Sequence, residues 1–230
     1  MLTKRFERLN ALADLISAST YLEIGVAKGK TFMNISVPYK VGVDPHFKFN
    51  FHDHADQNTI FYEVTSDFFF SKLAPGHSEF DLIYLDGLHT FEQTFRDFCA
   101  SIRYSHENTI WLIDDTCPNS WLAGQRNLRI AKKLRKSFGI KNQTWMGDVF
   151  KVVFAIHDFF PQFSYSTFSE HGQTAVWVAT RKNFAPTWNS LAKISRLGYR
   201  DFLKFRDSHL LVVEDQEIFE AVEMSRIRSN

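Results

Sequence analysis

The chain has 230 residues, of which 44% are hydrophobic and 16% aromatic. Lys and Arg total 27 against 26 Asp and Glu, and the net charge of +1 argues against a general nucleic-acid binder, which is usually strongly basic. The high aromatic content excludes a disordered chain. A chain of this length buries roughly 70% of the surface of its unfolded state, so we expect a globular domain that needs no disulfide or structural metal.

The cysteines and the hydropathy pattern bear on the compartment. Cys99 and Cys117 are too few for a disulfide framework, which favours a reducing environment. The first residues lack the apolar core of a signal peptide, and no run approaches the ~20 apolar residues of a membrane span. These features predict a cytoplasmic protein with no membrane and no nucleic-acid partner.

The first elements in chain order are a helix and a series of buried strands. Apolar side chains recur at helical spacing within residues 1–18, which predicts an amphipathic N-terminal helix. Five short apolar runs follow, at residues 21–24, 40–43, 60–64, 81–85 and 109–113. Such runs are typical of strands buried on both faces of a parallel sheet. We therefore expect a doubly wound α/β sheet of Rossmann-like type.

The clearest helix lies between the last two runs. Phe91, Phe95 and Phe98 share one helical face, and Thr90 and Gln93 have the spacing of a capping box. The helix should therefore begin at Thr90, within a strand–helix–strand unit that crosses over in the right-handed sense.

The C-terminal part of the chain changes pattern. Residues 149–160 predict a helix, and alternation around residues 163–167 and 174–180 predicts an antiparallel hairpin that closes the sheet. We expect residues 1–180 to form the main domain and residues 181–230 an extension packed on it. The basic segment 126–141 is typical of a solvated helix face, and it could pair with the acidic tail within the chain or across a homodimer.

An acidic side chain lies at or just after the end of every predicted strand, at the sheet edge where open α/β folds bind ligands. They are Glu23, Asp44, Asp67, Asp86 and the pair Asp114–Asp115. Gly25 and Gly29 follow the first strand, but their spacing does not match the G-x-G-x-x-G fingerprint of nicotinamide-binding folds. These glycines favour close approach to a ligand, or else a tight turn between strand and helix.

These motifs together resemble the S-adenosylmethionine-dependent methyltransferases with a Rossmann-like fold. The matching motifs are Glu23-x-Gly25-x-x-x-Gly29, Gly42-Val-Asp44-Pro45, Thr65-Ser66-Asp67, Asp86-Gly87-Leu88-His89 and Asp114-Asp115-Thr116. More narrowly, they are similar to the macrocin-type and cephalosporin-hydroxylase-like branch that modifies sugars and natural products. The resemblance covers about residues 20–180.

The resemblance implies a role for each motif. The loop at Glu23, Gly25 and Gly29 would hold the methionine end of the cofactor, and Asp44 would bind the ribose hydroxyls. The adenine edge and the magnesium site involve two further sets. Ser66, Asp67 and Phe68 would lie at the adenine, and Asp86, which also borders the cofactor, would bind Mg²⁺ with Asp114 and Asp115.

The residues themselves support a cation at this edge. Asp86 and Asp114 flank one strand–helix–strand unit, and clustered carboxylates repel one another unless they are protonated or bridged by a cation. Oxygen ligands suit Mg²⁺. The alternative is that one acid of the pair Asp114–Asp115 caps the following loop and no metal binds.

His89 is the candidate general base, with Asp86 beside it, because an imidazole can take a hydroxyl proton near neutral pH. Alternatively, His89 only hydrogen-bonds the start of the next helix. The expected function is O-methylation of a small hydroxylated acceptor, first a sugar or sugar-bearing natural product and second a catechol or phenol. A nicotinamide-dependent oxidoreductase and a non-catalytic methyltransferase-like module remain the alternatives.

Overall fold

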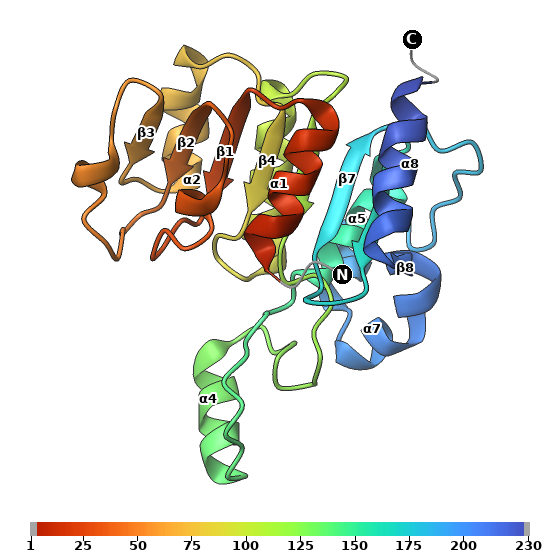
Figure 1. The fold of residues 1–230 in the computed structure, drawn as a ribbon. Coiled ribbons are helices and arrows are strands. Elements are labelled where there is room, and N and C mark those ends of the chain that lie inside the picture. The colour runs from red at the N-terminus through yellow and green to blue at the C-terminus, as the bar shows by residue number, and fades with distance from the viewer. Residues whose placement is uncertain (1–3, 228–230) are drawn as a thin grey trace.

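Residues 4–227 are described by the computed structural model, and their central feature is an eight-stranded sheet (Figure 1). The five buried runs of the sequence are its parallel strands: β1 (Thr20–Ile24), β2 (Tyr39–Val43), β3 (Thr59–Tyr62), β4 (Leu82–Leu85) and β5 (Ile110–Ile113). Their spatial order is β3-β2-β1-β4-β5, so the chain reverses direction across the sheet between β1 and β4. Such a reversal opens a crevice at the carboxyl ends of the strands.

The other half of the sheet contains the predicted hairpin. β6 (Phe163–Phe168) pairs antiparallel with β7 (Thr174–Val178), and β7 pairs antiparallel with β5. The two-residue strand β8 (Val212–Val213) then adds to β6 in parallel. The fold is therefore the expected mostly parallel α/β sheet with an antiparallel hairpin, and β8 is an element that the sequence pattern did not predict.

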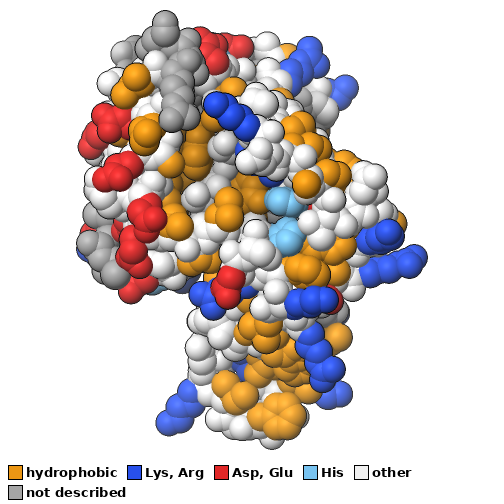
Figure 2. All heavy atoms as spheres, turned by 90° about the vertical axis from the view of Figure 1, so that its right-hand side faces the viewer, with side chains coloured by type: hydrophobic (Ala, Val, Ile, Leu, Met, Phe, Trp, Pro, Cys, Tyr) orange, Lys and Arg blue, Asp and Glu red, His pale blue; other side chains and the backbone are white. Residues whose placement is uncertain are grey.

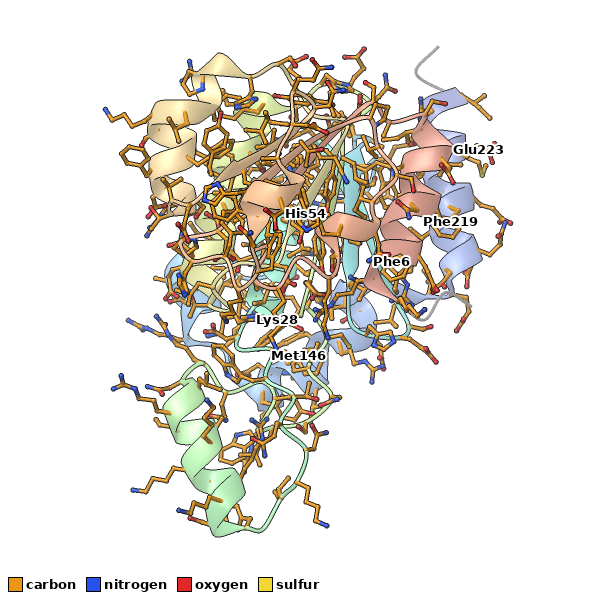
Figure 3. All side chains as sticks on the ribbon, turned by 60° about the vertical axis from the view of Figure 1, so that its left-hand side comes forward. Phe6, Lys28, His54, Met146, Phe219 and Glu223 are labelled. Atoms are coloured by element: carbon orange, nitrogen blue, oxygen red, sulfur yellow. The ribbon has the colours of Figure 1, made fainter. Side chains whose placement is uncertain are left out.

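Helices cover both faces of the sheet. One face carries α1 (Arg5–Ile16) and α8 (Asp215–Ile227), whose side chains share a buried apolar cluster. Phe6 and Phe219 border this cluster from the two helices (Figure 3). The other face carries α3 (Phe91–Ser101), α5 (Phe150–Phe159), α6 (Leu191–Arg196) and α7 (Tyr199–Phe205). None of the helices within residues 4–227 is long and apolar enough to cross a membrane.

The start of α3 confirms the predicted boundary but not the predicted cap. Thr90 is the N-cap residue, yet its side chain makes no capping hydrogen bond, and Gln93 points instead toward Ser66 and Asp97. The backbone N–H of Phe91 donates to Asp148 at 2.9 Å. The carboxylate of Asp148, from a distant loop, therefore caps this helix, and the Gln93 amide instead hydrogen-bonds to side chains at the cavity wall.

The basic segment belongs to an arm, residues 116–146, that leaves the body of the molecule. Helix α4 (Leu128–Ser137) lies at its outer end, and the arm rejoins the body at Met146 (Figures 1 and 3). Most of its basic side chains are exposed, as expected for a solvated helix face, beside exposed apolar residues such as Phe138 (Figure 2). Among the described residues, no ion pair joins this arm to the acidic tail.

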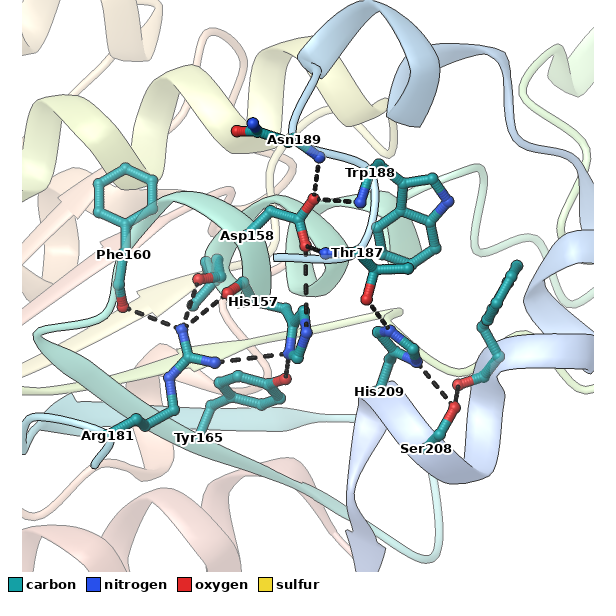
Figure 4. A network of polar contacts seen from close by, with 12 residues as sticks. His157, Asp158, Phe160, Tyr165, Arg181, Thr187, Trp188, Asn189, Ser208 and His209 are labelled. Atoms are coloured by element: carbon teal, nitrogen blue, oxygen red, sulfur yellow. Dashed lines mark hydrogen bonds and ion pairs between the residues drawn. The ribbon is translucent and has the colours of Figure 1, made fainter. Parts of the chain in front are cut away.

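A buried acid holds the C-terminal extension onto α5. Asp158 accepts hydrogen bonds from the backbone N–H groups of Thr187, Trp188 and Asn189 at 2.7–2.8 Å (Figure 4). The hydroxyl of Thr187 also contacts Nε2 of His209 at 2.8 Å. These bonds tie residues 187–189 to α5, so the segment after β7 runs against this helix.

Candidate active site

A cavity of about 560 Å³ opens at the carboxyl ends of β1, β2 and β4. Its lining includes seven residues predicted from the strand-end motifs: Gly25, Asp44, Ser66, Asp67, Asp86, Gly87 and His89. Its volume falls within the range of typical small-molecule sites. The structure therefore brings most of the predicted site residues into one place.

The loop after β1 is shaped by glycine and by Asp44. Gly25 has a φ of +96°, and a Cβ at this position would overlap the carbonyl oxygen of Asp86, so only glycine fits. Asp44 accepts the backbone N–H groups of Ala27 and His46, both at 2.8 Å. These two bonds fix the loop against the end of β2 and keep the Asp44 carboxylate at the cavity wall.

The far wall of the cavity is a small polar network around Gln93. Its side-chain amide donates to Ser66 at 3.2 Å, to Asp67 at 3.1 Å and to Asp97 at 3.0 Å. Asp97 is buried, and burial raises its pKa to about 6. The amide thus holds three acceptors at the position predicted for the adenine edge, where Arg96 also contacts Asp67 at 2.9 Å.

Three residues predicted for the cofactor do not line this cavity. Glu23 is buried within the sheet and accepts a 2.6 Å hydrogen bond from Tyr21, and burial raises its pKa to about 8. Gly29 lies under Phe49, and Phe68 is half exposed outside the cavity. Glu23 stabilises the strand beneath the site, because its side chain shares the face of β1 that carries Tyr21.

The predicted acidic cluster forms where β4 and β5 end. These strands are parallel neighbours, so Asp86 and the pair Asp114–Asp115 meet at one edge. Arg5 of α1 inserts its guanidinium among them. It lies 2.6 Å from Asp114, 3.5 Å from Asp86 and 3.9 Å from Asp115. An arginine from the start of the chain therefore supplies a positive charge at the place predicted for magnesium.

The titration behaviour of the cluster follows from burial and mutual charge. Burial and the neighbouring Asp115 raise the pKa of Asp114 to about 6, although Arg5 opposes this shift. Burial and the charge of Asp114 likewise raise the pKa of Asp86 well above its usual range. Burial lowers the pKa of Arg5, but the surrounding carboxylates outweigh this effect and raise it, so the guanidinium stays charged.

His89 is held by groups from two distant segments. Its Nδ1 makes a close contact with the Asp115 carboxylate. The Trp145 ring packs against the imidazole with ring centroids 5.1 Å apart. Gly147 has a φ of +64°, and a Cβ there would overlap the His89 carbonyl oxygen. The Trp145-x-Gly147 motif thus closes over the histidine, and the imidazole is oriented by contacts on several sides.

Three side chains at this edge could together hold a divalent cation. Ligand atoms of Asp86, His89 and Asp115 lie within 4.8 Å of one another, and carboxylates with an imidazole are suitable ligands. The guanidinium of Arg5 is nevertheless within ion-pair distance of all three carboxylates. With Arg5 in this position the residues do not fit a metal, because the charge that a metal would bring is already present.

The sequence patterns missed several residues of the site. Arg5, Gln93 and Asp97 line the cavity but were not predicted. Arg5 is separated from the carboxylates by more than 80 residues, so nothing local in the sequence links them. Asp97 could have been noticed in the sequence, because it is an acidic residue directly beside the apolar face of α3.

The comparisons with known proteins agree with this geometry. A family model described as a methyltransferase domain matches residues 22–116. This stretch, which is less than half of the chain, is similar to methyltransferase domains. The match runs from β1 to just beyond β5, so it contains Gly25, Asp44, Asp86 and Asp114–Asp115. No curated protein matches the chain.

Solved structures share the fold of this chain. An O-methyltransferase from Bacillus cereus in complex with S-adenosylhomocysteine is 14% identical, with a TM-score of 0.55 over 77% of this chain and 82% of that one. A methyltransferase from Podospora anserina, also bound to S-adenosylhomocysteine, is 13% identical, with a TM-score of 0.54 over 77% and 80%. An O-methyltransferase from Streptomyces achromogenes involved in tomaymycin synthesis is 13% identical, with a TM-score of 0.52 over 76% and 79%.

These findings confirm the recognition of a Rossmann-like methyltransferase from the strand-end motifs. They do not distinguish the macrocin-type and cephalosporin-hydroxylase-like branch from other branches, so that narrower assignment stays a prediction. The individual roles of the site residues also stay predictions.

Proposed function

We propose that this protein transfers the methyl group of S-adenosylmethionine to a hydroxyl of a small acceptor. The observation that carries the proposal is the His89–Asp115 contact at the wall of the cavity within the methyltransferase domain. An oriented imidazole at this edge is the group needed to take a proton from a hydroxyl.

The cavity suits the cofactor in shape and in polarity. Gly25 keeps a side chain out of the first loop, and Asp44 presents a carboxylate at the end of β2, where acids commonly bind ribose hydroxyls. Ser66 and Gln93 supply polar groups at the other end. Bound there, S-adenosylmethionine supplies a methyl group on a positively charged sulfur.

The chain's own residues position the acceptor and remove its proton. Asp115 contacts Nδ1 of His89 and so favours the tautomer in which Nε2 is the basic nitrogen. Nε2 of His89 would accept the hydroxyl proton of an acceptor whose oxygen takes the methyl group that bound S-adenosylmethionine would supply, leaving S-adenosylhomocysteine. General-base assistance of this kind contributes roughly 10²- to 10⁴-fold in rate.

In this proposal the guanidinium of Arg5 supplies the positive charge that balances Asp86, Asp114 and Asp115. Without it, three acids in one partly buried cluster would repel one another and draw protons. Arg5 pairs with Asp114, and the neighbouring Asp115 holds His89. No step passes through a metal, and the magnesium expected from the resemblance becomes a question for experiment.

The acceptor class rests on the resemblance. A sugar or a sugar-bearing natural product is the first expectation, and a catechol or phenol is the second. A homodimer and a cytoplasmic location likewise stay predictions.

Cofactor binding is the first test. Isothermal titration of the purified protein with S-adenosylmethionine and with NAD should give binding of the first only. Tighter binding of NAD would favour an oxidoreductase, and binding of neither would favour a non-catalytic module.

Methyl transfer is the second test. Labelled S-adenosylmethionine with a panel of sugars and phenols, followed by mass spectrometry, should identify the acceptor. His89→Gln should lower kcat with that acceptor, whereas His106→Gln, which changes a histidine paired with Asp81 at the other end of β4, should leave it unchanged. Equal rates for the two variants would remove His89 from the mechanism.

A further inference from the structure

A second cavity, of about 490 Å³, lies on the other side of the Arg5–Asp115 wall. Arg5 lines both cavities and Asp115 lines this one, and the remaining walls come from the arm, the β6–β7 turn and the C-terminal extension. Because Asp115 contacts His89, a molecule in this cavity has one end near the proposed base.

Arg206 is the unusual side chain of this cavity. It follows α7 and lines the cavity. Its Nε is buried with no hydrogen-bond partner. Within residues 4–227 no carboxylate forms an ion pair with it, and its polar contact is with the thiol of Cys117. A buried donor on a charged group without an acceptor is costly, and it is stabilised when a ligand supplies one.

The other charged side chains of the cavity do not form an ion pair with Arg206. Arg5 is already paired with Asp114, and Asp115 is paired with His89 and Arg5. Tyr199 of α7 supplies an aromatic wall near Arg206. At the end near the proposed base, Arg5 is therefore paired with carboxylates, whereas at the end formed by the extension Arg206 lies within ion-pair distance of no described carboxylate.

The geometry points to an acceptor that carries an anionic group, a carboxylate or a phosphate, bound by Arg206 while its hydroxyl faces Asp115 and His89. A guanidinium binds either anion through two parallel hydrogen bonds, so both are the same recognition chemistry. This inference rests on the proposed function and deepens it, because it names the class of acceptor for the same site.

Matched ligand pairs test the inference. We would titrate the full-length protein with 3,4-dihydroxybenzoate against 3,4-dihydroxybenzamide, and with glucose 6-phosphate against glucose. Within at least one pair the anion should bind about tenfold more tightly, the value of one charge-assisted hydrogen bond. The pair that shows the preference distinguishes a carboxylate from a phosphate.

Variants of Arg206 and Arg200 show which side chain causes the preference for the anionic ligand. Arg206→Gln should reduce it to less than about twofold, and Arg206→Lys should keep part of it, because lysine binds such anions as a point charge. Arg200→Gln is the matched control, since Arg200 is exposed on the preceding helix α7 and does not line the cavity. Thermal unfolding of each variant confirms that it is folded.

The outcomes separate this inference from the proposed function. Equal binding within both pairs, or a preference that survives Arg206→Gln as it survives Arg200→Gln, overturns the anionic acceptor. The titrations are run with and without S-adenosylmethionine. Failure to bind S-adenosylmethionine counts against methyl transfer, whereas the anion preference without it is judged on its own.

Discussion

Removal of the Arg5 guanidinium should destabilise the fold in a way that depends on pH. Arg5 lies 2.6 Å from Asp114, whose side chain is 1% exposed, and Arg5 itself is 45% exposed. Breaking a fully buried pair costs about 3–5 kcal/mol, and solvent screening at Arg5 reduces this, so we expect Arg5→Ala to cost about 2 kcal/mol at pH 8.

A matched control is available at the surface. Arg126 contacts Glu92 at nearly the same distance, 2.7 Å, but the Glu92 side chain is 42% exposed. Arg126→Ala should therefore cost less than about 1 kcal/mol. The comparison isolates the burial of the carboxylate, because residue type and contact distance are almost the same in both pairs.

The sign of the pH dependence follows from the pKa of Asp114. Burial raises this pKa to about 6, above its unfolded value, so the ionised carboxyl destabilises the fold above pH 6 and Arg5 offsets this cost. Below pH 6 the carboxyl takes up a proton and Arg5 has less to offset. The stability difference between wild type and Arg5→Ala should be full at pH 8 and largely lost by pH 5.

Urea unfolding followed by tryptophan fluorescence at pH 8, 6.5 and 5 measures this difference for both variants. Taking wild type minus variant at each pH removes the contributions of other titrating groups. The reasoning is refuted if Arg5→Ala loses the same stability at pH 8 and pH 5, or no more than Arg126→Ala at pH 8.

Four further predictions follow from the same contacts. Gly25→Ala should abolish S-adenosylmethionine binding in calorimetry, because its Cβ would overlap the end of β4, whereas Gly76→Ala, with open space around it, should bind normally. Arg5→Ala should bind Mn²⁺ in an electron paramagnetic resonance titration and wild type should not; binding by wild type would show that a metal displaces the arginine. Asp158→Ala should lower the free energy of unfolding by about 2–4 kcal/mol, because it leaves three backbone donors without an acceptor, and an unchanged urea midpoint would contradict this. Burial lowers the pKa of His209, so protonation of this side chain destabilises the fold, and the protection factors of amides in residues 187–210 against hydrogen exchange should fall as pH falls below 6.5; constant protection factors down to pH 5 would argue against it.

The sheet and its acidic edge were predictable because their signals are local. Each parallel strand is a short apolar run, and parallel neighbours place their carboxyl ends together, so Asp86 and Asp114 had to meet once β4 and β5 were adjacent. Gly25 was also readable, since a glycine after the first strand commonly marks close backbone approach.

The rest of the site depends on contacts between segments that are distant in sequence. Arg5 looked like an ordinary exposed position at the start of an amphipathic helix, and only the packing of α1 places it among the acids. Gln93 has the spacing of a capping residue, but Asp148 performs that role from another loop. Arg206 lies in the C-terminal extension. The sequence pattern predicted helices there, but it could not show that they form a wall of the second cavity.

The arm has a consequence for how this enzyme can vary. The chain leaves the carboxylate edge at Asp115 and returns at Gly147, so both ends of the excursion touch His89. The outer helix α4 contributes nothing to the first cavity. The outer part of the arm around α4 can therefore be exchanged for segments of different length or sequence while Trp145 and the two anchors keep the geometry of the proton-accepting pair, which makes it the natural place to graft new acceptor-binding loops.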